Sequence, residues 1–448
     1  MRFQTATLGC KVNQYETQYI RQALLDAGWQ ECDDDKSLVD YVIVNTCAVT
    51  SESDAKSRKL VAHWHKQCPQ AKIIVLGCSA TLHPATFEQL KGVERIQTDK
   101  RHLDHLLHSL NVPPPKNGIR SFDERHRAYV KIQDGCRVGC AYCIIPTVRP
   151  YLHSRTPDDV LTEMTSLAQN GFRELVLTGI HLGHYGLDFH ARGSETSLTD
   201  FLALREEKIG RDHSFLAMLL ERILASNLPV RVRLGSLEAV EVTPDLLDVL
   251  ASHQEVLCPQ LHLSMQSGDD SVLSRMKRRW PAAAYREKCE QIKERIPTIA
   301  LTTDVIVGFP GETDSQFQNT CDLCQRIGFA KIHLFRFSAR PGTLAAAMPN
   351  QISPQVKKER LAHLNSIANE LRTQYAKNFI GQKVQILVED SADSCVLGTT
   401  QHYLPATITP APDSQAVPLP CPGTLVDTIP HSWNANSDQL ESHCLIPQ

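Results

Sequence analysis

Three cysteines in the sequence CRVGCAYC carry the strongest chemical signal in the chain. Cys136, Cys140 and Cys143 form a CxxxCxxC motif directly after an expected β-strand. Three thiolates in one short loop can ligate three irons of a [4Fe–4S] cluster and leave the fourth iron free to bind another molecule. Zinc is the alternative, but His126 and His153 stand at spacings that are unusual for a fourth zinc ligand.

Three further cysteines each follow the end of an expected β-strand near the N-terminus. They are Cys10 in TLGCK, Cys47 in NTCAVT and Cys78 in VLGCSA. In a doubly wound sheet the carboxyl ends of parallel strands lie about 5 Å apart at one edge, where ligands collect. The positions therefore predict a second site of three thiolates. The alternative is that these cysteines are small apolar side chains packed at strand ends.

Length and composition place this chemistry in an ordinary globular protein. At 448 residues the chain suggests roughly three domains of about 150 residues. A hydrophobic content of 42% and a net charge of -3 show no global bias toward nucleic acid or membrane, so any nucleic-acid site must be local. The N-terminal sequence lacks a signal-peptide core, and no apolar run approaches the ~18 residues of a membrane span. We therefore expect a cytoplasmic protein whose fifteen cysteines are thiols or ligands rather than disulfides.

Short β-rich runs alternate with helical stretches from the N-terminus. The expected strands lie at 2–9, 41–46 and 71–77, and the expected helices lie near 14–27 and 52–66. This alternation predicts a doubly wound parallel sheet. Three prolines in NVPPPKNG then interrupt it. We expect an N-terminal cluster-binding domain over 1–112 and a linker over 113–127.

A second alternation of strands and helices follows the linker. Its six expected strands lie near 128–135, 174–179, 231–236, 260–267, 299–309 and 331–338. Six βα units predict a partial (βα)6 barrel over 128–345, with its active site at the C-terminal ends of the strands. The connection at 188–211 is unusually long, and we treat it as an insertion without assigned structure.

The C-terminal part of the chain has a different character. A helical connector is expected over 346–374, and β-like runs amid Pro, Gly and Ser predict a small all-β barrel over 375–448. From residue 376 onward there are two basic residues against seven acidic ones. Such a module repels phosphate on average, so any contact with RNA must use a small patch or shape.

Three other motifs have more than one interpretation. Cys321 and Cys324 form a CxxC motif within a helical stretch, which favours buried thiols over a redox pair. The run RMKRRW at 275–280 fits either a solvated surface or a contact with RNA phosphate. The glycines of VIVGFPGET at 305–313 are too few for a phosphate-binding loop and predict a tight turn close to a ligand.

Taken together, these motifs resemble the radical S-adenosylmethionine (SAM) methylthiotransferase family. CRVGCAYC resembles its radical-SAM loop, and TLGCKVNQYE, NTCAVT and GCSA resemble its N-terminal cluster-binding domain. LTGIHLGHYG, LHLSMQSGDDSVLSRMKRR, TDVIVGFPGET and FSARPGT follow in the family's order, so the resemblance covers about 3–405. Within the family, GCKVNQYE is most similar to the branch associated with tRNA that carries N6-threonylcarbamoyladenosine beside the anticodon.

The resemblance implies an enzyme that inserts a methylthio group at adenine C2 of that nucleoside. It implies two [4Fe–4S] clusters and SAM as cofactors. Cys136, Cys140 and Cys143 would hold the cluster that cleaves SAM to a 5′-deoxyadenosyl radical, which removes hydrogen from C2. Cys10, Cys47 and Cys78 would hold the cluster that carries the inserted sulfur, and a second SAM would supply the methyl group.

The resemblance also implies partners and a SAM pocket. The partners are a tRNA anticodon stem-loop, an external electron donor and a sulfur donor. The sequence does not identify either donor. No membrane partner is expected. Polar residues at strand ends are the pocket candidates, although such residues are often only loop caps. These candidates are Thr178, Gly179, His181, Ser236, Glu238 and Gln266.

The chain departs from the family pattern in a few places. Gly235 and Ser264 stand where the family has Ser and Pro, and Phe337 stands where it has Tyr. The C-terminal segment resembles an RNA-binding TRAM domain up to GTTQHY but fits poorly after about 405. The alternatives are a methylthiotransferase for isopentenyladenosine tRNA or for a ribosomal protein, or a non-catalytic, zinc-containing RNA-binding protein.

Overall fold

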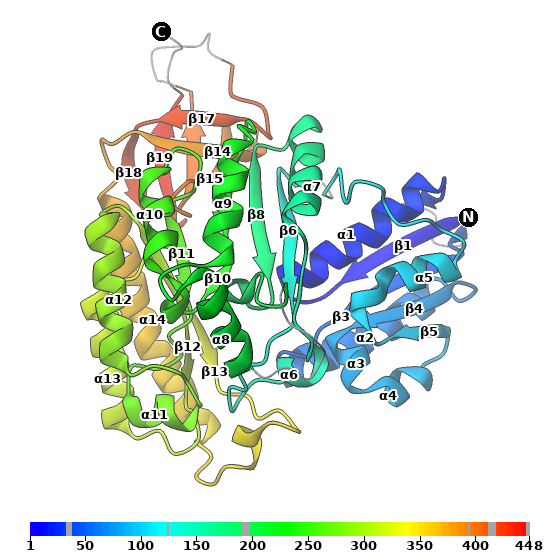
Figure 1. The fold of residues 1–448 in the computed structure, drawn as a ribbon, viewed down its shortest axis with the longest axis horizontal. Coiled ribbons are helices and arrows are strands. Elements are labelled where there is room, and N and C mark those ends of the chain that lie inside the picture. The colour runs from blue at the N-terminus through cyan, green and yellow to red at the C-terminus, as the bar shows by residue number, and fades with distance from the viewer. Residues whose placement is uncertain (33–37, 123–124, 190–197, 393, 411–417, 445–448) are drawn as a thin grey trace.

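The computed structural model describes residues 1–448 except 33–37, 123–124, 190–197, 393, 411–417 and 445–448. Figure 1 shows an N-terminal sheet with its helices, a larger curved sheet wrapped by helices, and a small C-terminal sheet. None of the described helices combines the length and the apolar character that crossing a membrane requires.

The N-terminal sheet is parallel, with strand order β2-β1-β3-β4-β5. Its strands are β1 (Arg2–Thr7), β2 (Gln30–Glu31), β3 (Tyr41–Thr46), β4 (Lys72–Gly77) and β5 (Val93–Gln97). Helices α1 (Lys11–Asp26) and α5 (Leu103–Ser109) cover one face. Helices α2 (Ser51–Gln67), α3 (Cys78–Leu82) and α4 (Pro84–Glu88) cover the other, and the 3-10 helix η2 (Lys100–His102) precedes α5. The predicted doubly wound sheet is confirmed, although α1 begins at Lys11, earlier than the expected residue 14.

The central sheet forms the predicted partial barrel. Its parallel strands are β6 (Arg127–Asp134), β8 (Glu174–Gly179), β9 (Arg231–Leu234), β10 (Ser236–Leu237), β11 (Gln260–Leu263), β12 (Ala300–Val307) and β13 (Lys331–Arg336). The short β7 (His153–Ser154) runs antiparallel to β6. The sheet divides into β7-β6-β8-β9 and β10-β11-β12-β13, and Val232 joins the two halves through backbone hydrogen bonds with Val256 and Cys258.

Six helices pack their buried residues on the outer face of this barrel: α7 (Pro157–Gln169), α9 (Phe215–Ala225), α10 (Pro244–Ser252), α12 (Ala282–Arg295), α13 (Asp314–Ile327) and α14 (Pro354–Lys377). The helices α6 (Ile145–Val148), α8 (Leu198–Ile209) and α11 (Asp270–Arg275) lie in the connections between strands. The 3-10 helices η3 (Leu182–His184), η4 (Ala239–Glu241) and η5 (Leu344–Ala347) lie in the connections. The long connection at 188–211, for which the sequence predicts no structure, contains α8. Its residues 190–197 lie outside the described part of the chain.

Successive side chains of the barrel strands face two different environments. Along β6, Val130 and Ile132 pack into the apolar core under the helices, so Arg127 and Lys131 point to the barrel interior. The same alternation recurs on the other strands. It gives the interior a set of polar and charged side chains: Arg127, Lys131, Glu174, Arg231, Arg233, His262, Asp304, Lys331 and His333.

The C-terminal part is all-β, as predicted. Its six strands pair in the order β17-β14-β15-β16-β19-β18, antiparallel except for β16 and β19. They are β14 (Val384–Ala392), β15 (Cys395–Thr400), β16 (Pro405–Thr409), β17 (Leu425–Thr428), β18 (Pro430–Asn434) and β19 (Gln439–His443). Figure 1 shows this sheet at one end of the barrel, next to the start of β8.

Buried ions join the C-terminal sheet to the N-terminal ends of the barrel strands. Glu174 receives hydrogen bonds from Arg231 Nε at 2.7 Å and from Arg233 Nε at 2.9 Å. The two guanidinium groups then donate to the carbonyl oxygens of Thr399 and Thr400 at 2.8 and 3.0 Å. The C-terminal sheet therefore lies at the end of the barrel opposite the cysteine loop, which follows the carboxyl end of β6.

We predict that Glu174→Gln destabilises this junction, because it leaves two buried guanidinium groups without their carboxylate. Breaking a buried ion pair costs about 3–5 kcal/mol. The midpoint of urea unfolding should fall clearly, and limited proteolysis should release a C-terminal fragment. Glu94→Gln is the control, because Glu94 pairs with Lys72 on the surface and should change stability by less than about 1 kcal/mol. Equal midpoints for both variants would contradict the structural role of Glu174.

Candidate active site

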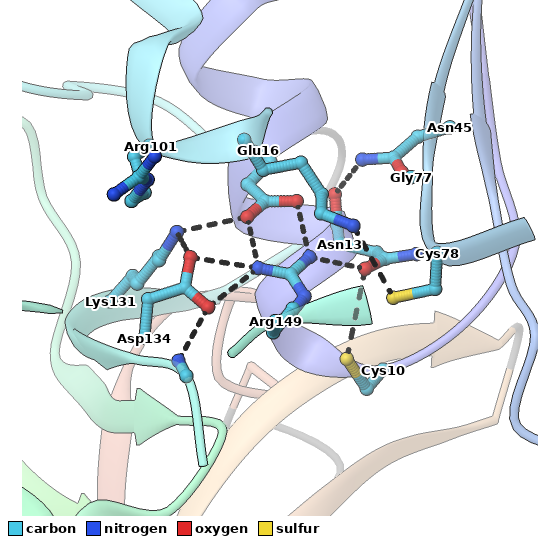
Figure 2. A network of polar contacts seen from close by, with 12 residues as sticks. Cys10, Asn13, Glu16, Asn45, Gly77, Cys78, Arg101, Lys131, Asp134 and Arg149 are labelled. Carbon is cyan, nitrogen blue, oxygen red and sulfur yellow. Dashed lines mark hydrogen bonds and ion pairs between the residues drawn. The ribbon is translucent and has the colours of Figure 1, made fainter. Parts of the chain in front are cut away.

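The three N-terminal cysteines lie together at the carboxyl edge of the first sheet. Cys10 precedes α1, Cys47 follows β3 and Cys78 begins α3. The strand register pairs Thr7 with Asn45, and Thr46 with Gly77, so the three strands end at the same level. Figure 2 shows Cys10 and Cys78 beside Asn13, and the backbone of Gly9, next to Cys10, closely approaches Cβ of Cys47.

Glycines let these strand ends approach so closely. Gly9 and Gly77 have φ angles of +115° and +98°, in the region that favours glycine. A Cβ atom on Gly77 would lie 2.3 Å from the carbonyl oxygen of Thr46, and one on Gly9 would lie 3.1 Å from Cβ of Cys47. Larger residues here would push the cysteines apart.

The second trio occupies one loop after β6. Cys143 N donates to the carbonyl oxygen of Cys140 at 3.0 Å, which closes a tight turn. Hydrogen bonds of Ala141 with Met276 and Ala345 hold the turn against the rest of the barrel. Burial raises the pKa of the Cys143 thiol to about 12, and the neighbouring Cys140 and Cys136 add to the shift. The site therefore favours thiolates only when a positively charged metal centre is bound.

Positively charged or hydrogen-bonding side chains accompany both trios. Arg278 Nη1 lies 3.3 Å from Cys140 Sγ, and Lys100 Nζ lies 3.9 Å from Cys78 Sγ. His181 Nδ1 lies 3.7 Å from Cys136 Sγ. Such groups stabilise thiolate ligands and the negative charge of a thiolate-bound cluster. The donor sets on this chain therefore fit two iron–sulfur clusters.

A buried ion network lies beside the first trio and joins α1 to the barrel, as Figure 2 shows. Arg149 donates to both carboxylate oxygens of Glu16 at 2.7 and 2.8 Å, and to Asp134 at 2.8 Å. Lys131 lies 2.9 Å from Glu16 and 2.6 Å from Asp134, so two cations face two anions. Glu16 belongs to α1, whereas the other three residues belong to the barrel. The network therefore fixes α1, and with it Cys10, against the cysteine loop.

The side chain of Asn13 links this network to the first trio. Arg149 Nη2 donates to Asn13 Oδ1 at 3.0 Å, and Cys10 Sγ lies 3.9 Å from the same oxygen. Asn13 Nδ2 donates to the carbonyl oxygens of Leu8 and Thr46, both at 2.9 Å. The side-chain amide of Asn13 thus holds together the ends of β1 and β3, the two strands that lead to Cys10 and Cys47.

A cleft of about 240 Å³ lies between the two lobes. Val49 and Thr50, just after Cys47, form one side, and the loop from Tyr142 to Ile145 forms another. The remaining lining combines apolar and aromatic side chains with a few polar groups: Gln266, Asp304, Ile306, Phe335, Arg336, Phe337 and Ser338. Beside it, Ala48 and Cys78 pack against Ile144 and Val148. Cys143 therefore lines this cleft, and the N-terminal site adjoins it through Val49, two positions after Cys47, and through Ile144, against which Cys78 packs.

The predicted SAM-pocket residues fall into two groups. His181 lies between Cys136 and Glu241, which it contacts at 2.5 Å, and Glu238 pairs with Arg278 at 2.8 Å. Gln266 lines the cleft with a φ of +71°. The structure brings these three to the cysteine loop. The other three lie at strand ends nearby: Thr178 is buried, Gly179 lies beside Gln133, and Ser236 is exposed.

Two of the motifs that were open in the sequence now have a defined place. In RMKRRW, Arg278 and Arg279 point inward and pair with Glu238, so these two side chains do not form a solvated or RNA-binding surface. Cys321 and Cys324 are fully buried in α13, which confirms the interpretation as buried thiols.

Sequence reasoning missed the residues that hold the site together, chiefly Arg149, Lys100 and Arg278. One signal was available: Cys10, Asn13 and Glu16 recur at a spacing of three, which places polar groups on one face of α1. Their partner Arg149 lies 133 residues from Glu16 in the chain. No local pattern marks such a contact.

Comparison with known proteins agrees with this geometry. The radical SAM superfamily model matches residues 130–324, and the model of an uncharacterized family, UPF0004, matches residues 2–97. The threonylcarbamoyladenosine tRNA methylthiotransferase MtaB of Bacillus subtilis is 32% identical over 89% of this chain and 88% of its own length. MtaB of Thermotoga maritima is 35% identical over the same shares. The chain belongs to the radical SAM methylthiotransferase family.

Other relatives in this methylthiotransferase family are named for a different substrate. A tRNA-2-methylthio-N(6)-dimethylallyladenosine synthase of Thermus thermophilus is 32% identical over 94% of this chain and 88% of its own length. Among solved structures, the radical SAM methyltransferase TsrM of Kitasatospora setae superposes with a TM-score of 0.54 at 14% identity, over 77% of this chain and 75% of TsrM. That likeness concerns the fold alone. As a radical SAM methylthiotransferase, the protein uses SAM and two [4Fe–4S] clusters.

We predict that Arg149→Met loosens the contact between α1 and the barrel. The substitution leaves Glu16 and Asp134 with Lys131 as their only cation within the network, at a cost of about 3–5 kcal/mol for a broken buried pair. Limited proteolysis should cut the 111–118 segment faster, and the melting temperature should fall. Arg295→Met removes an exposed guanidinium that pairs with Asp248 and should leave both measurements unchanged. Proteolysis at the wild-type rate in Arg149→Met would refute the clamp.

Proposed function

We propose that this enzyme inserts a methylthio group at adenine C2 of N6-threonylcarbamoyladenosine in a tRNA anticodon stem-loop. The observation that carries the proposal is the pair of cysteine trios that border one cleft. Sulfur insertion requires the hydrogen-abstracting species and the sulfur donor to meet at the same carbon, with water excluded. The relatives named MtaB and the motif GCKVNQYE support the choice of nucleoside.

The cysteines would have separate tasks. Cys136, Cys140 and Cys143 would hold one cluster, and Cys10, Cys47 and Cys78 would hold the other. When bound, the first supplies the electron that cleaves SAM and the second carries the sulfur to be inserted. Two SAM molecules are consumed, one as the radical source and one as the methyl donor. An external electron donor and a sulfur donor complete the stoichiometry.

The remaining site residues would position the substrates. His181, Glu238 and Gln266 are the proposed SAM contacts nearest the cysteine loop, with Thr178, Gly179 and Ser236 at the neighbouring strand ends. Phe335 and Phe337 of the cleft give a flipped-out base aromatic surfaces on which to stack. Gln266 and Asp304 offer hydrogen-bonding groups to its edge. The ion pair of Arg149 with Glu16 would hold both cysteine sites at a fixed distance from that base.

We also propose the division of labour among the parts of the chain. Residues 1–112 would form the cluster-binding domain, 113–127 the linker, 128–345 the radical SAM barrel, 346–374 the connector, and 375–448 a TRAM-like module that contacts tRNA. Because that module is acidic overall, its contact would depend on shape more than on charge. The enzyme would work in the cytoplasm, where its tRNA is found.

The substrate is tested by nucleoside mass spectrometry of tRNA from a strain that lacks the gene. We expect loss of 2-methylthio-N6-threonylcarbamoyladenosine and recovery when the gene is returned. Loss of the 2-methylthio-isopentenyl nucleoside instead would replace the proposed substrate with that of the dimethylallyl relatives. An unchanged tRNA profile would point to a protein substrate and refute the proposal.

The separate tasks are tested by alanine variants in the anaerobically reconstituted enzyme. Cys136→Ala should abolish SAM cleavage, measured as 5′-deoxyadenosine, because one ligand of the SAM-cleaving site is lost. Cys10→Ala should retain SAM cleavage but form no methylthio product. The iron content of each variant should fall by about half, since each keeps one intact site. Cys324→Ala is a buried-thiol control that should keep both reactions. Product formation by Cys10→Ala would contradict its role.

A further inference from the structure

The barrel interior is charged where an ordinary (βα) barrel is filled with branched apolar side chains. Glu174 pairs with Arg231 and Arg233, and His262 Nε2 lies 3.1 Å from Asp304. Asp304 also lines the cleft between the lobes. The cleft therefore meets the polar interior at Asp304, and such an interior suits a polar extension of the substrate.

Lys11 reaches this interior through the open side of the barrel. Strands β6 and β13 do not pair with each other in the described structure, so the barrel is open between them, and α1 packs beside β6. Lys11 Nζ lies 5.9 Å from the ring centre of Tyr129 on β6. Tyr129 lies on the face of β6 that also carries Arg127 and Lys131, the face that points to the barrel interior. Lys11 therefore lies beside this interior.

The Lys11 ammonium makes no ion pair or hydrogen bond with the residues that the structure describes. The carboxylates of the barrel interior are already engaged: Glu174 by Arg231 and Arg233, and Asp304 by His262. Toward the cysteines, Glu16 and Asp134 are held by Arg149 and Lys131. A partly buried ammonium without a counter-charge is unfavourable, and a bound anion offsets that cost.

We propose that Lys11 binds the carboxylate of the threonylcarbamoyl group on the substrate adenosine. This inference rests on the proposed function and adds its basis for specificity. Lys11 follows Cys10 directly, so the carboxylate would lie beside the N-terminal cysteine site while C2 reacts. A neutral dimethylallyl group has no charge to pair with Lys11, and it would leave the ammonium uncompensated. The tRNA backbone phosphates would lie outside the barrel.

The test compares three fluorescent anticodon stem-loops with the full-length, iron-loaded enzyme. One carries threonylcarbamoyladenosine, one carries its neutral threonine-amide analogue, and one carries unmodified adenosine. By anisotropy, the wild type should bind the acid at least about tenfold more tightly than the amide, the usual effect of one charge-assisted hydrogen bond. Lys11→Met should lose this preference while its affinity for the amide stays within about twofold. Lys11→Arg should keep most of it.

Controls separate specificity from folding. Lys59→Met removes an exposed lysine of α2 and should bind like the wild type. Iron content and melting temperature show whether Lys11→Met is folded. Retention of the acid preference in Lys11→Met would overturn the inference, as would an equal loss of affinity for all three stem-loops, which would indicate a phosphate contact. If the wild type forms no product on the threonylcarbamoyl stem-loop, the proposed substrate itself is wrong.

Discussion

The buried guanidinium of Arg149 is the contact on which the rest of the site depends. It binds Glu16 from the N-terminal lobe and Asp134 from the barrel at the same time, and Lys131 balances the charge. Desolvated ions of this kind tolerate little displacement, because each lost partner leaves an unpaired charge in a medium of low dielectric constant. The network therefore sets the separation of the two cysteine sites more tightly than apolar packing alone.

Charge also explains how buried thiols can serve as ligands. Burial raises the pKa of Cys47 and of Cys143, which disfavours their thiolates. Arg278 and Lys100 place positive charge next to one cysteine of each trio. The chain thus prepares two sites that are unfavourable for free thiolates and favourable for thiolates bound to metal. The same distribution of charge leaves Lys11 as a cation for the substrate.

How much of this structure the sequence predicted depends on how far apart in the chain the interacting residues lie. Strands β3 and β8 lie where their β-rich runs predicted, because that signal is local. The position of Cys10, Cys47 and Cys78 followed from topology, since parallel strands end at a common edge. The contacts of Arg149 with Glu16 and of Arg278 with Cys140 could not be predicted, because each joins residues more than a hundred positions apart. The sequence of helix α8 in the long connection shows too weak a hydrophobic periodicity for a helix to be predicted there.

The most direct test of the account is an anomalous-scattering map at the iron edge from crystals of the anaerobically reconstituted enzyme. The account predicts two separate iron sites. One should be bounded by Cys10, Cys47 and Cys78, the other by Cys136, Cys140 and Cys143, and both should face the cleft that contains Gln266 and Phe335. A single iron site, or two sites that open to different faces of the protein, would contradict it.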